Sequence, residues 1–405
     1  MEPVHLKMDW HPCHLRAKIN LISNVKKFIH GATHAPFIFL ACVLLTWTVP
    51  GSGRAQDSNP GGIGPKPFID YFLPTPLTGS LSKDVWGAAT VGPRDAKNGL
   101  EDATMKKWNY WDGKIVKGPD GKYYMFASRW DQANGHTGWG DSKAVEAVSD
   151  TMLGPYLDQG LLWPDNEGGK GHNVTALEIP DHGGYAVEVS ETRNGDVFTS
   201  SAITGPFTQL GGITVTGDNR WHGSNVSLMP RPDGGFEIIQ RSGQVMTSKN
   251  ILGPYDVKSG NIYQNLAGMP QNNLGSLEDP VIWSSGGLFH VVVNNWADRR
   301  AYHLISVDGI KDWKYQGVAY DPTRDFVRYT DGTVNHWNKM ERPGVLIENG
   351  HVTAVSLACI DVPKDDEKGN DDHGSKIVVI PFDGAAMDKD LQSAMASGSS
   401  TVAPP

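Results

Sequence analysis

The chain has 405 residues, of which 39% are hydrophobic and 20% are charged, and its formal net charge is −9. This length suffices for one large all-β domain or for two ordinary domains. The negative charge argues against nucleic acid and anionic membranes as partners, because both repel an acidic surface.

The N-terminus has the pattern of an export signal. Several lysines and arginines precede an apolar run at residues 37–49, and small residues follow at Gly53-Arg54-Ala55. We therefore expect residues 1–55 to be a signal peptide, with an uncleaved anchor as the alternative. Only Cys359 remains beyond this segment, so the mature chain has no intramolecular disulfide. We expect a secreted or periplasmic bacterial protein without stable membrane association after cleavage.

Composition divides the rest of the chain into three parts. Residues 56–66 are rich in glycine, proline and polar residues and predict a flexible linker. Residues 390–405 are rich in Ala, Ser, Gly and Pro and predict a disordered tail. Residues 67–389 contain no break in composition, and we expect them to form one domain.

Five short segments within this domain follow one pattern, in which polar residues stand directly before an apolar, strand-like run. These anchors recur roughly every 50 to 65 residues, and a Gly-containing turn and a second strand follow each one. They begin at Trp111-Asp112, His172-Asn173, Ser224-Asn225, Glu278-Asp279 and Glu341-Arg342.

Three of the repeats end in a Gly-Pro-aromatic turn, at Gly154-Pro155-Tyr156, Gly205-Pro206-Phe207 and Gly253-Pro254-Tyr255, and Trp313 takes the place of the aromatic in the fourth. Similar hairpins occur in β-sandwiches and jelly rolls. The regular order of anchor, hairpin, third strand and turn favours an all-β, five-bladed β-propeller with four strands in each blade.

In a propeller the first strand of every blade lines the central channel, so the anchor residues meet at one end of it. Aromatic residues such as Trp130 lie close to the anchors in the sequence. Carboxylates beside aromatic faces are typical of a carbohydrate site. The candidates are Asp112, His172, Asn173, His222, Asn225, Glu278, Asp279, His336, Glu341 and Arg342.

Glycoside hydrolysis requires a proton donor and a group that activates water. Asp112 is our candidate for the base, although an Asp before Gly113 also suits a simple turn. The acid is Glu278, Asp279 or His336. Strand alternation directs only one of Glu278 and Asp279 into the channel, and the register favours Asp279 unless a bulge intervenes. Both carboxyls could instead cap the blade, and His336 could bind an axial ion or water.

The remaining candidates are predicted to bind substrate. His172 and His222 suit sugar hydroxyls or a uronate carboxylate, or are structural. Asn173, Asn225 and Trp130 belong to the same group. Glu341 and Arg342 either form an ion pair that holds the mouth together or contact substrate, and the acidic segment 361–373 predicts a solvated loop with rim contacts as the alternative.

No phosphate-binding glycine loop, paired-cysteine zinc site or Gly-x-Ser-x-Gly elbow occurs in the sequence. We therefore expect an enzyme that needs no cofactor. A structural divalent cation such as Ca²⁺ on the propeller axis is compatible with the acidic anchors.

The segment from Trp111 to Phe126, the Gly-Pro-aromatic turns and Glu278-Asp279-Pro280 together resemble five-bladed propeller glycoside hydrolases of the family 43 group, over residues 86–385. That group includes the family 117 enzymes, which release 3,6-anhydro-galactose from agar fragments. The resemblance implies an inverting hydrolase that acts on chain ends or side chains. It matches Asp112 to the base, Glu278 to the acid, and His336 to the histidine acid of family 117.

The sequence departs from family 43 at the second blade, where His172-Asn173 replaces the usual Asp. This departure favours the histidine-assisted branch and leaves the sugar open. Two other hypotheses are a lyase that uses histidines with Arg342 against a uronate, and a carbohydrate-binding propeller without catalysis.

Overall fold

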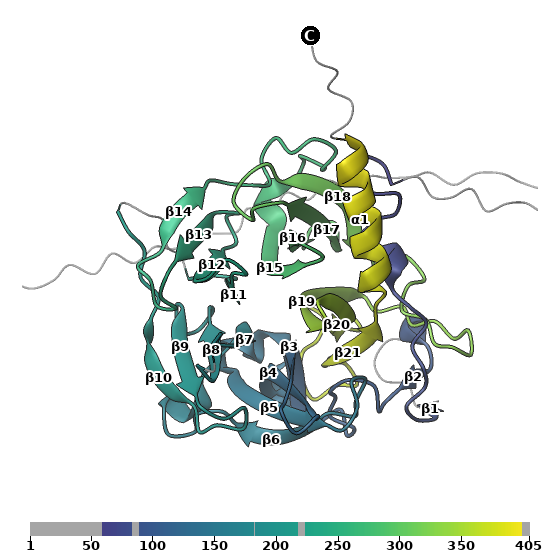
Figure 1. The fold of residues 1–405 in the computed structure, drawn as a ribbon. Helices are drawn as coiled ribbons and strands as arrows, with labels where there is room; N and C mark the ends of the chain where they lie inside the picture. The colour runs from purple at the N-terminus through teal and green to yellow at the C-terminus, as the bar shows by residue number, and fades with distance from the viewer. Residues whose placement is uncertain (1–58, 83–88, 182, 218–222, 399–405) are drawn as a thin grey trace, which may run out of the picture. The chain divides into compact units, whose positions relative to one another are not determined.

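Five antiparallel sheets surround one axis in the computed structural model, which describes residues 59–82, 89–181, 183–217 and 223–398 (Figure 1). In each sheet the strand that follows the anchor is innermost, and the next strands pair outward in chain order. The all-β, five-bladed propeller that the sequence predicts is therefore confirmed.

Each blade is built as one continuous stretch of chain. The first contains β3 (Trp108–Lys117), β4 (Tyr123–Asp131), β5 (Lys143–Ser149) and β6 (Leu157–Leu161). The second contains β7 (Val174–Glu178), β8 (Tyr185–Val189), β9 (Asp196–Ser200) and β10 (Thr208–Gly212). The third contains β11 (Ser227–Pro230), β12 (Phe236–Ile239), β13 (Val245–Ser248) and β14 (Asp256–Ser259). The fourth contains β15 (Leu277–Ser285), β16 (Leu288–Asn295), β17 (Arg300–Ser306) and β18 (Lys314–Tyr320).

The fifth blade has three strands instead of the expected four: β19 (Lys339–Glu348), β20 (His351–Ile360) and β21 (Ser375–Pro381). Instead of a fourth strand, isolated β-bridges from residues before the first blade lie along its outer edge. Leu100 pairs with Ile377, and Phe72 pairs with Phe382. Backbone from before the first blade therefore covers the outer edge of the last one, which protects that edge from pairing with other chains.

Short elements lie outside the blades. They are the strands β1 (Leu81–Ser82) and β2 (Arg94–Asp95) and the 3-10 helices η1 (Phe68–Tyr71), η2 (Ala89–Val91), η3 (Gln132–Asn134), η4 (His136–Asp141), η5 (Glu167–Gly169) and η6 (Leu274–Ser276).

The hydrophobic core consists of layers between neighbouring blades. One layer joins Ile115 and Met125 of the first blade to Leu346 and Val379 of the fifth. The turn aromatics close the outer part of these layers, where Tyr156, Phe207, Tyr255 and Trp313 are all buried. The repeated Gly-Pro-aromatic turn thus has a packing role in each layer.

The predicted disordered tail is wrong for residues 390–398, which belong to the helix α1 (Gly384–Gly398). Asp383 starts this helix by accepting a hydrogen bond from the Ala386 N–H across 3.0 Å. Met387 and Leu391 then bury their side chains against the fourth and fifth blades. The small-residue composition was misleading because alanine is also the strongest helix former.

Part of the segment predicted to be a flexible linker is also packed against the propeller. Residues 59–66 pack against β18, where the backbone N–H of Gly64 donates to Oε1 of Gln316 across 2.9 Å. The side-chain Nδ2 of Asn59 donates to the backbone oxygen of Gln316. The predicted signal peptide, residues 1–55, lies outside the described residues. Among the described residues, no helix combines the length and apolar character that crossing a membrane requires.

Candidate active site

The second residue of every anchor has a left-handed backbone. The five φ angles lie between 46° and 69°, and all five side chains are buried. We call these residues the axial ring: Asp112, Asn173, Asn225, Asp279 and Arg342. Asp and Asn adopt this conformation more readily than other residues that carry a Cβ, which explains the choice in four blades. The repeat recognised in the sequence is therefore a repeat of backbone conformation.

In the first, fourth and fifth blades the left-handed residue coincides with a β-bulge. Pairing shifts register between Asp112 and Lys114, between Glu278 and Val281, and between Glu341 and Gly344. A bulge re-aims side chains, so that neighbours in sequence need not face opposite sides. Glu278 and Asp279 accordingly both reach Glu341, and one carboxylate oxygen of each of the three lies within 4.8 Å of the others. The expectation from simple alternation, one inward carboxylate, was wrong.

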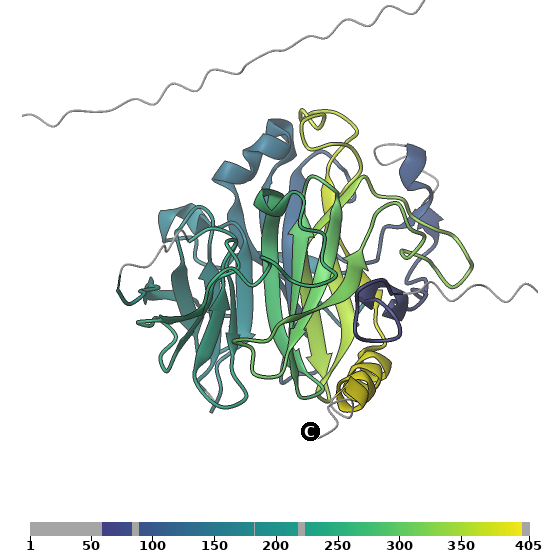
Figure 2. The ribbon, with the colours of Figure 1, turned by 90° about the horizontal axis from the view of Figure 1, so that it is seen from above.

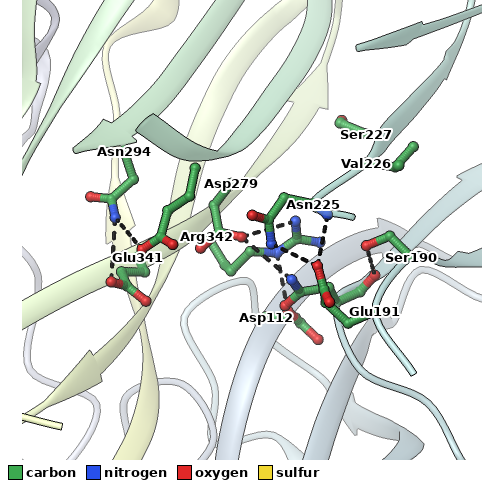
Figure 3. A network of polar contacts seen from close by, with 12 residues as sticks. Asp112, Ser190, Glu191, Asn225, Val226, Ser227, Asp279, Asn294, Glu341 and Arg342 are labelled. Atoms are coloured by element: carbon green, nitrogen blue, oxygen red, sulfur yellow. Dashed lines mark hydrogen bonds and ion pairs between the residues drawn. The ribbon is translucent and has the colours of Figure 1, made fainter. Parts of the chain in front are cut away.

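Arg342 lies between two carboxylates of the axial ring (Figure 3). Its Nε donates to Oδ1 of Asp112 across 3.1 Å, and its Nη1 lies 3.5 Å from Oδ1 of Asp279. The second distance is an ion-pair contact and is too long for a strong hydrogen bond. Asn173 also reaches Asp279, with 3.4 Å between its Nδ2 and Oδ1. One guanidinium therefore connects the first, fourth and fifth blades.

Asp112 has further partners besides Arg342. Its Oδ2 accepts a short hydrogen bond from the Ser128 hydroxyl and another from the backbone N–H of Val174 across 3.1 Å. Burial raises the pKa of Asp112, whereas Arg342, Ser128 and Val174 act in the opposite direction by stabilising the carboxylate. Asp112 also lines one end of a cavity that runs along the propeller axis.

Glu278 and Glu341 meet on one side of the axial ring, which we call the mouth. Two lysines hold Glu341 there. Lys339 contacts Oε1 across 2.5 Å, and Lys364 contacts Oε2. Burial alone would raise the pKa of Glu341, but these two ammonium groups lower it to about 2. The ion pair predicted between Glu341 and Arg342 does not form, because Glu341 pairs with lysines and Arg342 pairs with aspartates.

These ion pairs bear on the expected axial cation. Three carboxylates converge, as a cation site requires, but Lys339 and Lys364 neutralise Glu341, and Arg342 neutralises Asp279. Ammonium and guanidinium groups thus already neutralise two of the three carboxylates. The residues present fit such an ion poorly.

Glu278 is the least enclosed of the three carboxylates, with its side chain 16% exposed. Asn294 Nδ2 lies 3.4 Å from its Oε1 and also donates to Glu341 across 3.3 Å. Arg241 approaches the other oxygen at 3.6 Å. Burial, and then the charges of Asp279 and Glu341, raise the pKa of Glu278 to about 8. Lys364 and Lys339 act in the opposite direction, and the net shift in pKa favours the protonated form of Glu278.

Aromatic and imidazole rings gather on the side of the first and second blades. His172 is buried and lies 5.1 Å from the ring of Trp139, which is 39% exposed. Trp130, a predicted sugar platform, is instead buried beneath His172 and His136. Burial first, and then positive neighbours that include Lys364, lower the pKa of both histidines to about 3. The lowered pKa favours the neutral form of both rings, and neither Nδ1 has a hydrogen-bond partner among the described residues.

Asn225 belongs to a separate part of the network. Oε1 of Glu191 accepts hydrogen bonds from its backbone N–H across 2.9 Å, from its Nδ2 across 3.2 Å, and from the Ser224 hydroxyl across 2.7 Å (Figure 3). Glu191 follows β8, so this contact joins the second blade to the third.

The structure does not bring His336 into this network. Its side chain is 46% exposed, and its Nε2 lies 3.7 Å from Oδ1 of Asp325 on the loop before β19. Its backbone N–H donates to the backbone oxygen of Val91 in η2, outside the blades. The sequence placed His336 with the anchors because it stands five residues before Glu341, but the loop turns outward before the strand begins. His222 lies outside the described residues.

Sequence reasoning missed several residues of the site. Lys364 comes from the segment predicted to be a solvated loop. Figure 2 shows this yellow-green loop and the blue segment with η3 and η4 above the same face of the propeller, with α1 toward the opposite face. Asn294, at the end of β16, and Glu191, directly after β8, were missed because the polar candidates came from the segments that lead into the first strands.

Comparison with known proteins finds no matching family model and no matching curated protein. Among solved structures the chain is similar to a glycoside hydrolase at 14% identity and a TM-score of 0.48, with 70% of this chain and 61% of that chain covered. It is similar to an α-L-arabinofuranosidase from Podospora anserina at 11% identity and a TM-score of 0.48, with 71% and 94% covered. It is also similar to a family 117 glycoside hydrolase from the marine bacterium Zobellia galactanivorans at 13% identity and a TM-score of 0.47, with 71% and 88% covered. Chains this different share folds without sharing activities, so the functional argument rests on the residues of the site.

Proposed function

We propose that this protein is a glycoside hydrolase in which Glu278 is the general acid and Asp112 the general base. The observation that supports this most directly is that the two carboxyls adjoin one network but have opposite partners. Burial and the charges of Asp279 and Glu341 favour the protonated form of Glu278. Burial also raises the pKa of Asp112, but Asp112 accepts hydrogen bonds from Arg342, Ser128 and Val174, which favour its carboxylate. Neighbours that act in opposite directions in this way suit acid and base roles.

Glu278 is a better candidate for the acid than either rival. Asp279 is buried and contacts Arg342, so its role in the proposal is to raise the pKa of Glu278 by its charge. His336 is directed towards Asp325, away from the carboxylates. Glu278 alone combines partial exposure at the mouth with a raised pKa.

The surroundings of Glu278 can accommodate a sugar. A cavity of about 490 Å³ is lined by Leu277, the residue before Glu278, and by Arg241, which approaches Glu278. Its lining also includes Ser224, Gln240 and Asn261. Trp296 follows β16 and is 47% exposed, and Trp139 is exposed next to His172 on the other side. These two rings replace the buried Trp130 as proposed stacking platforms. His172, Asn173, Asn225 and Arg342 are the proposed polar contacts or supports.

The substrate we propose is a polysaccharide or oligosaccharide, cleaved with inversion at a chain end or a side chain, as the resemblance to family 43 implies. Side chains fill every role in this reaction, and no cofactor enters it. Export to the periplasm or the cell exterior remains our proposal from the leader pattern, and N-terminal sequencing of the mature protein tests it.

A lyase is less well supported than a hydrolase. A lyase needs a base to remove a proton next to a carboxylate, and catalysis is most efficient when the base has a pKa near the working pH. The pKa of about 3 makes His172 and His136 weak bases. Arg342, the proposed partner of the uronate, already contacts two aspartates.

A panel of plant and marine oligosaccharides, analysed by thin-layer chromatography, tests the proposal. Wild-type protein should release new reducing sugar. Asp112→Asn and Glu278→Gln should lower the rate by about 10²–10⁴-fold with unchanged circular dichroism. Products that absorb through a new C=C bond would instead establish a lyase. Binding of the panel without turnover would establish a carbohydrate-binding protein.

A further inference from the structure

A cavity of about 560 Å³ runs along the propeller axis on the far side of the axial ring from the mouth. The innermost strands β3, β7, β11, β15 and β19 surround it, as Figure 1 shows in a view along the axis. Asp112 and Arg342 border one end of this channel, and Lys117, Pro180, Pro230 and Ile347 border the other. None of the steps proposed for catalysis uses the channel beyond its border at Asp112.

Five charged residues line the channel, namely Asp112, Lys114, Lys117, Glu178 and Arg342. Glu178 is exposed at the end of β7, and most of the others are paired. Asp112 is bound to Arg342, and Lys117 at the other end contacts Glu348 across 2.6 Å. Lys114 is different. It is half-buried on β3, and its hydrogen-bond partner within the described chain is the uncharged backbone oxygen of Val345, at 2.7 Å. An ammonium group has three N–H donors, so two remain after this bond.

An unpaired ammonium is a costly group for this position. Removing it from water is unfavourable, and burial lowers the pKa of Lys114 to about 8. Leu or Met would line the channel without that cost. A purely structural lysine would use its stem for packing and bring its charge to water, yet Lys114 directs its Nζ across the channel wall from β3 to β19.

The wall offers another donor. Ser227 on β11 accepts a hydrogen bond from the Ile282 N–H across 3.2 Å, which leaves its hydroxyl proton to donate elsewhere. Arg342 adds positive charge at the ring. Apart from Asp112, which Arg342 binds, and Glu178, which is exposed at the far end, the charged and hydroxyl groups of the channel named here are donors, which is the opposite of the set expected for an axial metal ion.

We propose that the axial channel binds a small monovalent anion, a halide or a short carboxylate, at Lys114. Such an anion would neutralise the ammonium, satisfy its remaining N–H groups and connect the inner strands of the first and fifth blades. The site lies across the axial ring from the mouth and does not depend on the proposed hydrolase activity.

Crystals soaked in sodium bromide test the location directly. The anomalous signal of bromide should appear in the channel within hydrogen-bond distance of Lys114 Nζ. In parallel, the thermal unfolding midpoint is measured in rising potassium chloride and potassium acetate for wild-type protein, Lys114→Met and Lys117→Met. General salt effects act on all three proteins alike, and Lys117→Met is the control for removal of a paired lysine from the same channel.

The wild-type and Lys117→Met midpoints should rise by roughly 2 °C more than that of Lys114→Met, because only they retain the site. Equal responses of the three proteins would overturn the proposal. A bromide peak at Lys114 with equal responses would mean an adventitious ion only, and would overturn it as well. If Lys114→Met does not fold, Lys114→Gln serves in its place. The anion response should also weaken above about pH 8, as Lys114 loses its proton.

Discussion

Arg342 donates from its Nε to Oδ1 of Asp112 across 3.1 Å, and this contact joins the last blade of the propeller to the first. The same guanidinium contacts Asp279 in the fourth blade. Both aspartates and the arginine are buried, and all three have a left-handed backbone. Arg342 is thus the common partner of the charges around which the proposed site is built.

Replacing Arg342 with methionine should therefore destabilise the fold strongly. The change leaves two buried carboxylates without their cation, and breaking a buried ion pair costs about 3–5 kcal/mol. Urea unfolding measures the loss. Arg300→Met is the matched control, because Arg300 pairs with Asp321 while 41% exposed, and exposed pairs contribute about 0–1 kcal/mol. Equal losses in the two variants would contradict the structural role of Arg342.

The pH dependence of hydrolysis should reveal Glu278. A general acid must be protonated, and the pKa of Glu278 is raised to about 8 by burial and by its negative neighbours. The value of kcat/KM should accordingly decline above about pH 8. The residual activity of Glu278→Gln should lack this alkaline limb, because the amide does not titrate. An unchanged limb in the variant would assign it to another group.

His336→Ala should retain wild-type activity, since its imidazole lies near Asp325 on an exposed loop. His172→Ala is the informative comparison, because His172 is buried beside Trp139 and is affected by the charges of Arg342 and Lys364. We expect its KM to rise. Initial rates at several substrate concentrations separate a change in KM from a change in kcat. A large loss of kcat in His336→Ala would show that His336 is the acid.

Acid should weaken the fold through His290, which is fully buried between Ser285 and His303. Burial lowers its pKa to about 4, so between pH 6.5 and 4 only the unfolded chain takes up the proton. Its contribution is constant above this window and falls as the pH falls through it, by about 2 kcal/mol between pH 7.5 and 5.

Comparison with His290→Gln isolates this contribution. Buried acids such as Glu237, whose pKa is raised to about 8, change stability in the opposite direction and are common to both proteins. The free energy of unfolding, measured in urea at both pH values, should therefore fall more in the wild type. Parallel pH dependence would show that His290 does not titrate in this way.

The C-terminal helix should contribute to stability. Leu391 is fully buried in the core layer of the fourth and fifth blades, and Leu391→Ala should cost about 2–5 kcal/mol. Lys389→Ala changes an exposed residue on the same helix and should cost less than about 0.5 kcal/mol. Urea unfolding compares them. A loss for Leu391→Ala as small as that for Lys389→Ala would indicate that the helix is not docked in solution.

The sequence predicted the repeat because one backbone requirement left a visible trace. Each blade needs a left-handed residue at the ring, and Asp or Asn fills it in four cases. The Gly-Pro-aromatic turns were visible for a similar reason, since each buries its ring between blades. The fifth blade lacks its fourth strand because chain from Phe72 and Leu100 covers its edge, and pairing between such distant segments leaves no local signal.

The site was predicted less completely than the fold. Asp112, Glu278 and Asp279 were found because they stand in anchors. Lys364 was missed because a charged loop gives no indication of where one of its lysines will reach. His336 was misplaced because nearness in sequence to Glu341 did not reveal the outward turn of the loop.

The central claim, that Glu278 donates the proton and Asp112 activates the attacking group, is tested most directly with two substrates of the sugar that the panel identifies. One is the natural oligosaccharide, and the other carries a dinitrophenyl leaving group, which departs without protonation. Glu278→Gln should lose activity on the oligosaccharide and keep it on the dinitrophenyl glycoside, whereas Asp112→Asn should lose both. Equal losses of Glu278→Gln on the two substrates, or full activity of Asp112→Asn on either, would contradict the assignment.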